Sequence, residues 1–187
     1  MKIATCTLAS AAPYSPSRAY SQEVERLPRE THDAYEVRTW RHKCHSTKDG
    51  NVFIPPMAFK MSVDAAAKTL GRQIPGRGKS TYTKFFSSGV LVMEPLVLPV
   101  KMDEVAMDRI HANADGVRGS GKRVWRNFPR IEHWTGDIQF HVLADEITPE
   151  VFEEHVKQAG AFIGIGRFRP QNGGFYGRYE VKKVRWN

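Results

Sequence analysis

The sequence predicts an α+β protein. Strands from two halves of the chain form one antiparallel sheet, and a helix from each half packs on it. Two stretches, 56–70 and 149–159, repeat apolar residues at the spacing of a helix face. Strand-like stretches flank both, so each half of the chain reads strand, helix, strand. With 187 residues, 41% of them apolar, the chain is sized for a single domain spanning 1–187.

The first 54 residues are expected to form a strand, a long excursion and a hairpin. Residues 2–9 are small or β-branched and alternate weakly, which favours a strand. Residues 10–33 contain three prolines and mixed charge without a sustained period, so they predict a proline-rich excursion from the domain. A strand-like run from Tyr35, a polar turn at 48–51 and a returning apolar run predict a hairpin over 34–54.

The first helix is bounded by proline and glycine. Pro55 and Pro56 precede apolar residues on one helical face, and Gly71 stands where the helix should end. Residues 72–84 follow as a basic loop insertion, and 89–98 indicate a buried strand interrupted by a proline.

The second half is expected to start with a short helix over 102–112. A second basic loop insertion follows over 113–130 and contains three glycines. Alternation over 137–143 predicts a strand. Thr148, a capping hydroxyl followed by proline and glutamate, predicts the start of the second main helix, and Gly160 its end.

A glycine-rich stretch over 164–179 leads from that helix into a terminal strand over 176–186. The stretch holds five glycines and three arginines among aromatic residues. Glycine lets a backbone approach a partner closely, arginine binds phosphate and rings stack on bases. The alternative is a long turn in which glycine serves only the backbone conformation and the arginines are solvated.

Positive charge is concentrated in three segments, 72–84, 117–130 and 167–187. They hold 15 of the 28 basic residues and 1 of the 20 acidic ones. The rest of the chain therefore has 13 basic and 19 acidic residues, a net charge of 13 − 19 = −6, although the whole chain carries +8. A cationic surface on an acidic body indicates a polyanionic partner. The alternative is that these loops are basic without a function.

Rings and arginines alternate in 124–130, which suggests a stacking platform flanked by phosphate contacts. Trp125 or Phe128 could instead belong to the core. The residues expected from these patterns to bind nucleic acid are Arg77, Lys79, Lys84, Arg118, Lys122, Arg123, Trp125, Arg126, Arg167, Phe168, Arg169, Gly173, Gly174, Tyr176 and Arg178.

Two glycine motifs fail to match a nucleotide-binding pattern. Residues 76–81 resemble a phosphate loop, but the position that requires glycine is Gln73, and a helix rather than a strand precedes it. Gly164 and Gly166 match half of a dinucleotide fingerprint whose third glycine position is Arg169. Nucleotide hydrolysis is therefore not expected.

No cofactor or metal site is predicted. Among His42, Cys44 and His45 only two residues would share a strand face, and no second ligand pair is evident. Cys6 and Cys44 are too few for a disulfide framework, which fits a reducing cytoplasm. No apolar run is long enough for a membrane helix, so no membrane partner is expected.

Catalysis has no clear pattern in this sequence. His133, His141 and His155 are scattered, and any one of them could act as a general acid or base. No Ser–His–Asp order or carboxylate pair supports them, so the sequence favours a protein that is not an enzyme.

The order of helix, glycine- and arginine-rich loop and last strand resembles the RAMP superfamily of CRISPR-associated RNA-binding proteins. The residues that carry the resemblance in the loop are Gly164, Gly166, Arg167, Arg169, Gly173, Gly174, Gly177 and Arg178. The segment 54–60, in which prolines open a helix that carries Lys60, is similar to a family helix with an inward or RNA-facing lysine.

The resemblance implies a ferredoxin-like or RRM-like antiparallel sheet with two main helices and a C-terminal glycine-rich loop. It also implies Lys60 as a further contact and a homo-oligomer assembled along RNA. The excursion 10–33 and the basic insertion 113–130 do not match the family, and no histidine matches the position used by its RNA-cleaving branch. The small size is similar to that of phage-encoded proteins.

The function expected from the sequence is binding of single-stranded RNA or DNA through the phosphate backbone with little sequence specificity. The first alternative is a RAMP-like endoribonuclease that uses a histidine as general acid or base. The second is a structural or partner-binding phage protein whose basic loops contact an acidic protein. The sequence does not distinguish RNA from DNA, because it does not reveal which groups would meet a 2′-hydroxyl.

Overall fold

Four strands form the central sheet of the structure, a computed structural model that describes residues 1–20, 22–114, 119 and 121–187. Their order is β4-β8-β1-β9, and every neighbouring pair is antiparallel. Along the chain they alternate with two helices as β1-α2-β4 and β8-α4-β9, which is the order of a ferredoxin-like fold and confirms the predicted class. The elements are β1 Lys2–Ser10, α2 Pro56–Leu70, β4 Val90–Leu91, β8 Thr135–Val142, α4 Pro149–Gln158 and β9 Tyr179–Trp186.

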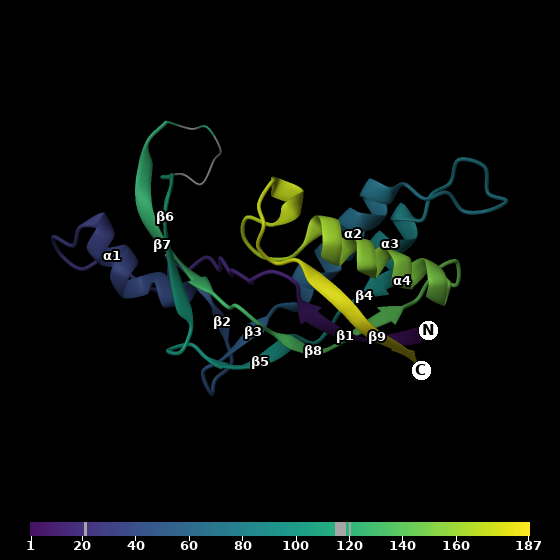
Figure 1. The fold of residues 1–187 in the computed structure, drawn as a ribbon, viewed down its shortest axis with the longest axis horizontal. Coiled ribbons are helices and arrows are strands. Elements are labelled where there is room, and N and C mark those ends of the chain that lie inside the picture. The colour runs from purple at the N-terminus through teal and green to yellow at the C-terminus, as the bar shows by residue number, and fades with distance from the viewer. Residues whose placement is uncertain (21, 115–118, 120) are drawn as a thin grey trace.

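Helix α2 begins and ends where the sequence predicts. Proline occupies its first turn, where no backbone N–H is needed, and Gly71 ends it in the left-handed conformation with φ 54°. Its buried face, which includes Phe59 and Val63, packs on the sheet next to α4. In Figure 1 the helical layer of α2, α3 (Thr83–Gly89) and α4 lies along one side of the sheet.

Helix α4 begins as predicted but continues past the glycine expected to end it. The Thr148 hydroxyl accepts a hydrogen bond from the Val151 amide at 3.4 Å. The chain then forms a wider turn, η2 (Ala159–Ile163), and turns away only at Gly164 with φ 71°. Gly160 serves packing instead, because a Cβ atom there would lie 2.1 Å from the carbonyl oxygen of Tyr179 on β9.

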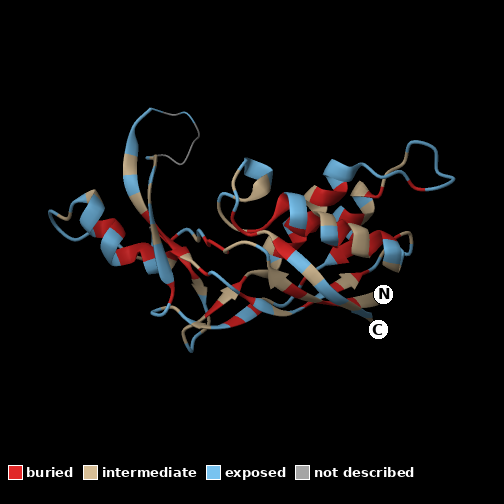
Figure 2. Cartoon of the chain, in the orientation of Figure 1, coloured by how far each residue is buried: buried red, intermediate tan, exposed pale blue. Residues whose placement is uncertain are grey.

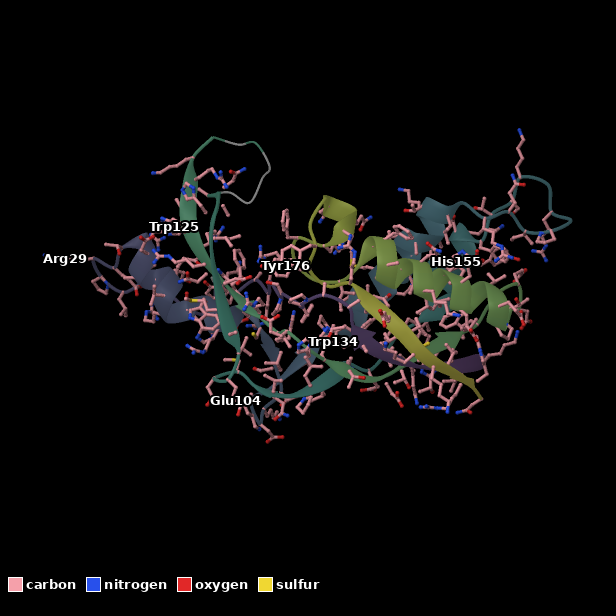
Figure 3. The ribbon with its side chains drawn as sticks, viewed as in Figure 1. Arg29, Glu104, Trp125, Trp134, His155 and Tyr176 are labelled. Carbon is pink, nitrogen blue, oxygen red and sulfur yellow. The ribbon has the colours of Figure 1, made fainter. Side chains whose placement is uncertain are left out.

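Aromatic rings fill the space between the sheet and the helices. The Phe59 ring of α2 forms T-shaped pairs with Trp134 and Tyr179, with ring centroids 6.2 and 6.1 Å apart. Phe140 of β8 and Phe152 of α4 form a third such pair, with centroids 5.3 Å apart. Figure 2 shows the buried residues concentrated along this interface. Trp134 and His155, labelled in Figure 3, lie in this part of the molecule.

The opposite face of the sheet is polar. Asp137 accepts hydrogen bonds from Thr7 and Arg185, each at 2.6 Å, across three neighbouring strands. By the strand register, the described residues of β1, β8 and β9 on this face include no Phe, Tyr or Trp. The sheet therefore lacks the ring platform on which RRM domains stack bases.

The insertion between β4 and β8 is mostly strand, where a helix and a loop were expected. The predicted strand 89–98 divides at its proline: β4 stays in the central sheet, whereas β5 (Leu96–Lys101) pairs with β3 (Asn51–Ile54). The helix predicted over 102–112 is wrong, because β6 (Ala106–Asn113) pairs along its length with β7 (Arg123–Arg130). The C-terminal part of the basic insertion 113–130 is thus one strand of a hairpin.

The hairpin predicted over 34–54 is confirmed only at its C-terminal end. β2 (His45–Ser46) pairs with β3, but α1 (His32–Thr39) and the 3₁₀ turn η1 (Trp40–Lys43) replace the first predicted strand. The Thr31 hydroxyl caps α1 by accepting from the Ala34 amide at 3.2 Å. This local cap competes successfully with the alternating pattern that indicated a strand.

The remaining insertions extend to opposite ends of the molecule. The excursion 10–33 is anchored by Tyr14, which is 2% exposed and bridges to Ile131. The basic loop 72–84 is shortened by α3 (Thr83–Gly89) and lies at the end that carries both termini, whereas α1 and the β6–β7 hairpin lie at the other end (Figure 1). Among the described residues, no helix has the length and apolar character needed to cross a membrane.

Candidate nucleic-acid interface

A groove of about 1710 Å³ lies where three segments far apart in the sequence meet. The described lining residues of one wall come from 17–43 around α1, those of the second from 110–128 of the β6–β7 hairpin, and those of the third from 167–176 of the glycine-rich stretch. We call it the basic groove. In Figure 3 Tyr176 marks the third wall, between the hairpin and the helical layer.

Basic side chains outnumber acidic ones by six to one among the described lining residues of the basic groove. Glu36 is the one acidic residue among the described lining residues, and His32 and His111 line it as well. The basic lining residues are Arg18, Arg26, Lys43, Arg123, Arg126 and Arg167. Because these charges come from all three walls, folding gathers charge that is dispersed along the sequence.

Arg167 lies at the junction of the glycine-rich stretch and the hairpin. Its guanidinium carbon is 3.9 Å from the ring centroid of Phe128 and 4.9 Å from that of Tyr176. Nε donates to the Ser15 hydroxyl at 3.2 Å, whereas Nη2 is buried without a hydrogen-bond partner among the described residues. Burial lowers the pKa of Arg167. The arginine is therefore held in place by rings while one donor is left unused.

A buried ion pair within the first wall is hydrogen-bonded to the second wall. Lys43 Nζ lies 2.7 Å from Glu36 Oε2 and donates to the Asn127 carbonyl at 2.7 Å, and the Asn127 amide donates to Glu36 at 3.1 Å. Arg126 approaches the same carboxylate at 3.5 Å. Burial alone raises the pKa of Glu36, but the hydrogen bonds from Lys43 and the Asn127 amide outweigh it and leave the pKa below its usual value. The pair fixes α1 against β7.

The first wall also carries stacked rings that the sequence did not single out. Tyr20 and Tyr35 stack with their centroids 6.2 Å apart, and the Arg26 guanidinium lies 5.4 Å from the Tyr35 ring. The arginines and tyrosines of residues 18–35 are widely spaced and mixed with four acidic residues, unlike the compact alternation in 124–130. No sequence pattern therefore identifies this wall.

The glycines of the glycine-rich stretch mainly allow the chain to pack on itself. A Cβ atom at Gly174 would lie 1.7 Å from the Phe168 carbonyl oxygen, and one at Gly177 would lie 1.8 Å from that of Ile165. Gly174 therefore serves the fold of the loop, and its expected role in the close approach of a ligand stays a prediction. Gly173 lines the groove and has φ 74°.

Some of the predicted contacts meet in the basic groove, and others lie beside it. Trp125 stands outside the lining, 5.2 Å from the ring of His111 and 5.2 Å from the Arg109 guanidinium. Arg169 bonds to Gln171, and Arg178 donates to the Ala161 carbonyl. The predicted residues that line the groove are Arg123, Arg126, Arg167, Phe168, Gly173 and Tyr176. Those outside its lining are Lys122, Trp125, Arg169, Gly174 and Arg178. Arg118 lies outside the described residues.

The basic loop 72–84 does not reach the groove. It lies at the far end of the helical layer (Figure 1), so Arg77, Lys79 and Lys84 share no surface with the three walls. Arg77 is paired with Glu146 at 2.8 Å. A single cationic track that joins all three basic segments, as the sequence suggested, is therefore not formed within one copy of the chain.

Lys60 is a structural residue. The residue is only 7% exposed. Its ammonium group is paired with Asp64 and donates to the carbonyl oxygens of Phe86 and Ser87, both at 3.0 Å. These bonds tie α2 to α3. We therefore leave Lys60 out of the interface, because its donors are already used inside the protein.

The histidines named as candidate acids or bases do not line the groove. His155 is fully buried, stacks on Phe86 at 4.3 Å and has its Nδ1 2.6 Å from the Val151 carbonyl oxygen. Burial lowers the pKa of His155. His133 and His141 are absent from the lining as well. Among the described residues, no group of three or more histidine, cysteine, aspartate or glutamate side chains is placed to hold a metal ion.

Comparison with known proteins finds similarity among solved structures but none in sequence. No protein-family model and no curated protein matches the sequence. Among solved structures, Cmr6 from Pyrococcus furiosus aligns over 97% of this chain and 99% of its own, with 13% sequence identity and a TM-score of 0.49. A similarity of this degree assigns neither a family nor a function.

Proposed function

We propose that the protein binds single-stranded nucleic acid in the basic groove, mainly through the phosphate backbone. The observation that carries this proposal is the lining itself, with six basic side chains from three walls and a single carboxylate. That carboxylate is already bonded to Lys43 and Asn127, so it adds little repulsion toward a polyanion. Arg167, which lines the groove and is held between the rings of Phe128 and Tyr176, supports a phosphate contact there.

The size of the groove favours a polymer over a metabolite. Its volume of about 1710 Å³ exceeds the roughly 300–1,000 Å³ that is typical of small-molecule pockets. Its cations are spread over walls contributed by three segments rather than focused on one point. An extended chain of phosphates matches that distribution better than a single phosphate group does.

Salt dependence of binding tests the proposal. Lys43 is buried and bonded to Glu36 and Asn127, and Arg18 and Arg126 have carboxylate partners, so three to five groove cations are available to phosphates. At about −0.7 per contact, the plot of log K against log salt for a single strand should have a slope of about −2 to −3.5. Affinity for a labelled 30-mer should then fall about 20- to 130-fold between 50 and 200 mM salt.

A matched pair of variants locates the site. Arg123→Gln removes an exposed groove cation, so it should flatten the slope by about 0.7. Arg77→Gln removes a cation from the distant basic loop and should leave the slope unchanged. A flat plot for the unmodified protein, or equal effects of the two variants, would refute binding in the groove.

Cleavage of the bound strand is the second candidate function, because His32 and His111 line the groove from two of its three walls. Incubation of labelled RNA and DNA strands with and without EDTA tests it. Shortened products that disappear in a His32→Gln/His111→Gln variant would support cleavage, and intact strands under both conditions would exclude it.

RNA as the ligand and assembly of several copies along it follow from the resemblance to RAMP proteins. Affinities for RNA and DNA strands of equal length test the first of these. The number of protein copies on strands of increasing length, measured by native mass spectrometry, tests the second. One copy on every length would exclude assembly along the strand.

A further inference from the structure

Two phenylalanines stand exposed on the third wall of the basic groove. Phe168 is 50% exposed and Phe175 is 52% exposed, and both belong to the groove lining. A large exposed ring adds little to the stability of a fold, and aromatic side chains that remain open beside cations are typical of surfaces that bind bases. These rings are not used by the backbone contacts described above.

The protein holds Phe168 in place through its backbone. Its φ of 49° lies in the left-handed region, which bulky residues rarely adopt. The Phe168 carbonyl accepts from the Tyr176 amide at 3.3 Å, and Gly174 packs directly against the same carbonyl. The surrounding loop therefore imposes an unfavourable conformation on a residue whose side chain points to solvent, which is a feature of functional sites.

Phe175 is held by a different route. Its ring stacks on Tyr176 with centroids 4.2 Å apart and planes inclined by 29°. Tyr176 is 5% exposed, and its hydroxyl donates to Asp108 on the β6–β7 hairpin. One side of the Phe175 ring is thus supported by a buried and hydrogen-bonded neighbour, while half of its surface remains open.

We infer that the rings of Phe168 and Phe175 stack on unpaired bases of a strand whose phosphates lie on the groove arginines. The inference rests on the proposed function and defines its substrate more narrowly as a strand with accessible base faces. Stacking is tolerant of base identity, because every base has a π-face. A duplex keeps its bases stacked on one another and should bind more weakly than a single strand of equal charge.

Leucine substitutions separate stacking from charge. Phe168→Leu and Phe175→Leu keep an apolar side chain and remove the ring, so each should weaken binding of a 30-mer at least about fivefold. The slope of log K against log salt should stay unchanged, because no cation is lost. Phe162→Leu is the matched control: Phe162 is 65% exposed but lies outside the groove, and its replacement should alter affinity less than twofold.

A second measurement uses the unmodified protein and so does not depend on the folding of variants. An abasic 30-mer carries the same phosphates without bases, and it should bind at least about fivefold more weakly than an ordinary strand. Equal affinity for the two strands would overturn the stacking inference, while a normal salt slope would leave the proposed function intact. If neither strand binds, the proposed function and the inference both fail.

Discussion

Replacing Glu36 by glutamine should destabilise the fold strongly, because it leaves the Lys43 ammonium buried without a countercharge. The side chains of Glu36 and Lys43 are 3% and 5% exposed, and their charged atoms are 2.7 Å apart. Breaking a buried pair by removing one partner costs about 3–5 kcal/mol. For a chain of this length the loss corresponds to a fall in Tm of about 6–20 °C.

The assay is urea unfolding of the single variant beside the double variant Glu36→Gln/Lys43→Met. The double variant removes both charges, so it should regain most of the lost stability, although the bond from Lys43 to the Asn127 carbonyl is also lost. The reasoning is refuted if Glu36→Gln costs less than about 1 kcal/mol, or if the double variant is no more stable than the single one.

The same pair makes a signed prediction for pH. The pKa of Glu36 is lowered in the folded protein, so its contribution to stability is present above its ordinary value of 4.5. That contribution is lost as pH falls through the lower folded value. The free energy of unfolding of Glu36→Gln should therefore fall less on acidification than that of the unmodified protein. Urea unfolding at a series of pH values measures this difference.

Two further substitutions test the loop and the core. Gly174→Ala places a methyl group against the Phe168 carbonyl and should cost about 1–3 kcal/mol in urea unfolding, together with loss of strand binding. The control Gly76→Ala adds a methyl group in open space away from the groove and should spare binding. His155→Phe keeps a ring against Phe86 but removes the imidazole, whose pKa is lowered by burial. The free energy of unfolding of this variant should therefore fall less steeply than that of the unmodified protein as pH drops below 6.5. An unchanged pH profile would contradict the lowered pKa of His155.

Elements with local start and stop residues could be predicted from the sequence. Pro56 and Gly71 bound α2, and Thr148 with its following proline starts α4, because capping depends on neighbours along the chain. The strand over 106–113 was missed because its stability comes from pairing with 123–130, and its exposed face gives no clear period. Pairing between distant segments is invisible to a local pattern.

The candidate site shows the same division. The charge on Arg123, Arg126 and Arg167 could be identified from composition, and folding brings these residues to one groove. Composition could not show that loop 72–84 lies at the other end of the molecule. It also could not show that Tyr20 and Tyr35 would face the hairpin, since that wall exists only once α1 packs on β7.

The position of β1 in the sheet has a consequence for how the protein is made. This first strand lies between β8 and β9, so both of its neighbours are synthesised more than 120 residues after it. During translation its backbone donors and acceptors have no sheet partner until residues 135–142 emerge from the ribosome, and one edge stays open until 179–186 follow. Late strand pairing of this kind is slow and exposes an aggregation-prone edge. Nascent chains stalled before residue 179 should therefore depend on chaperones more than the full-length chain does.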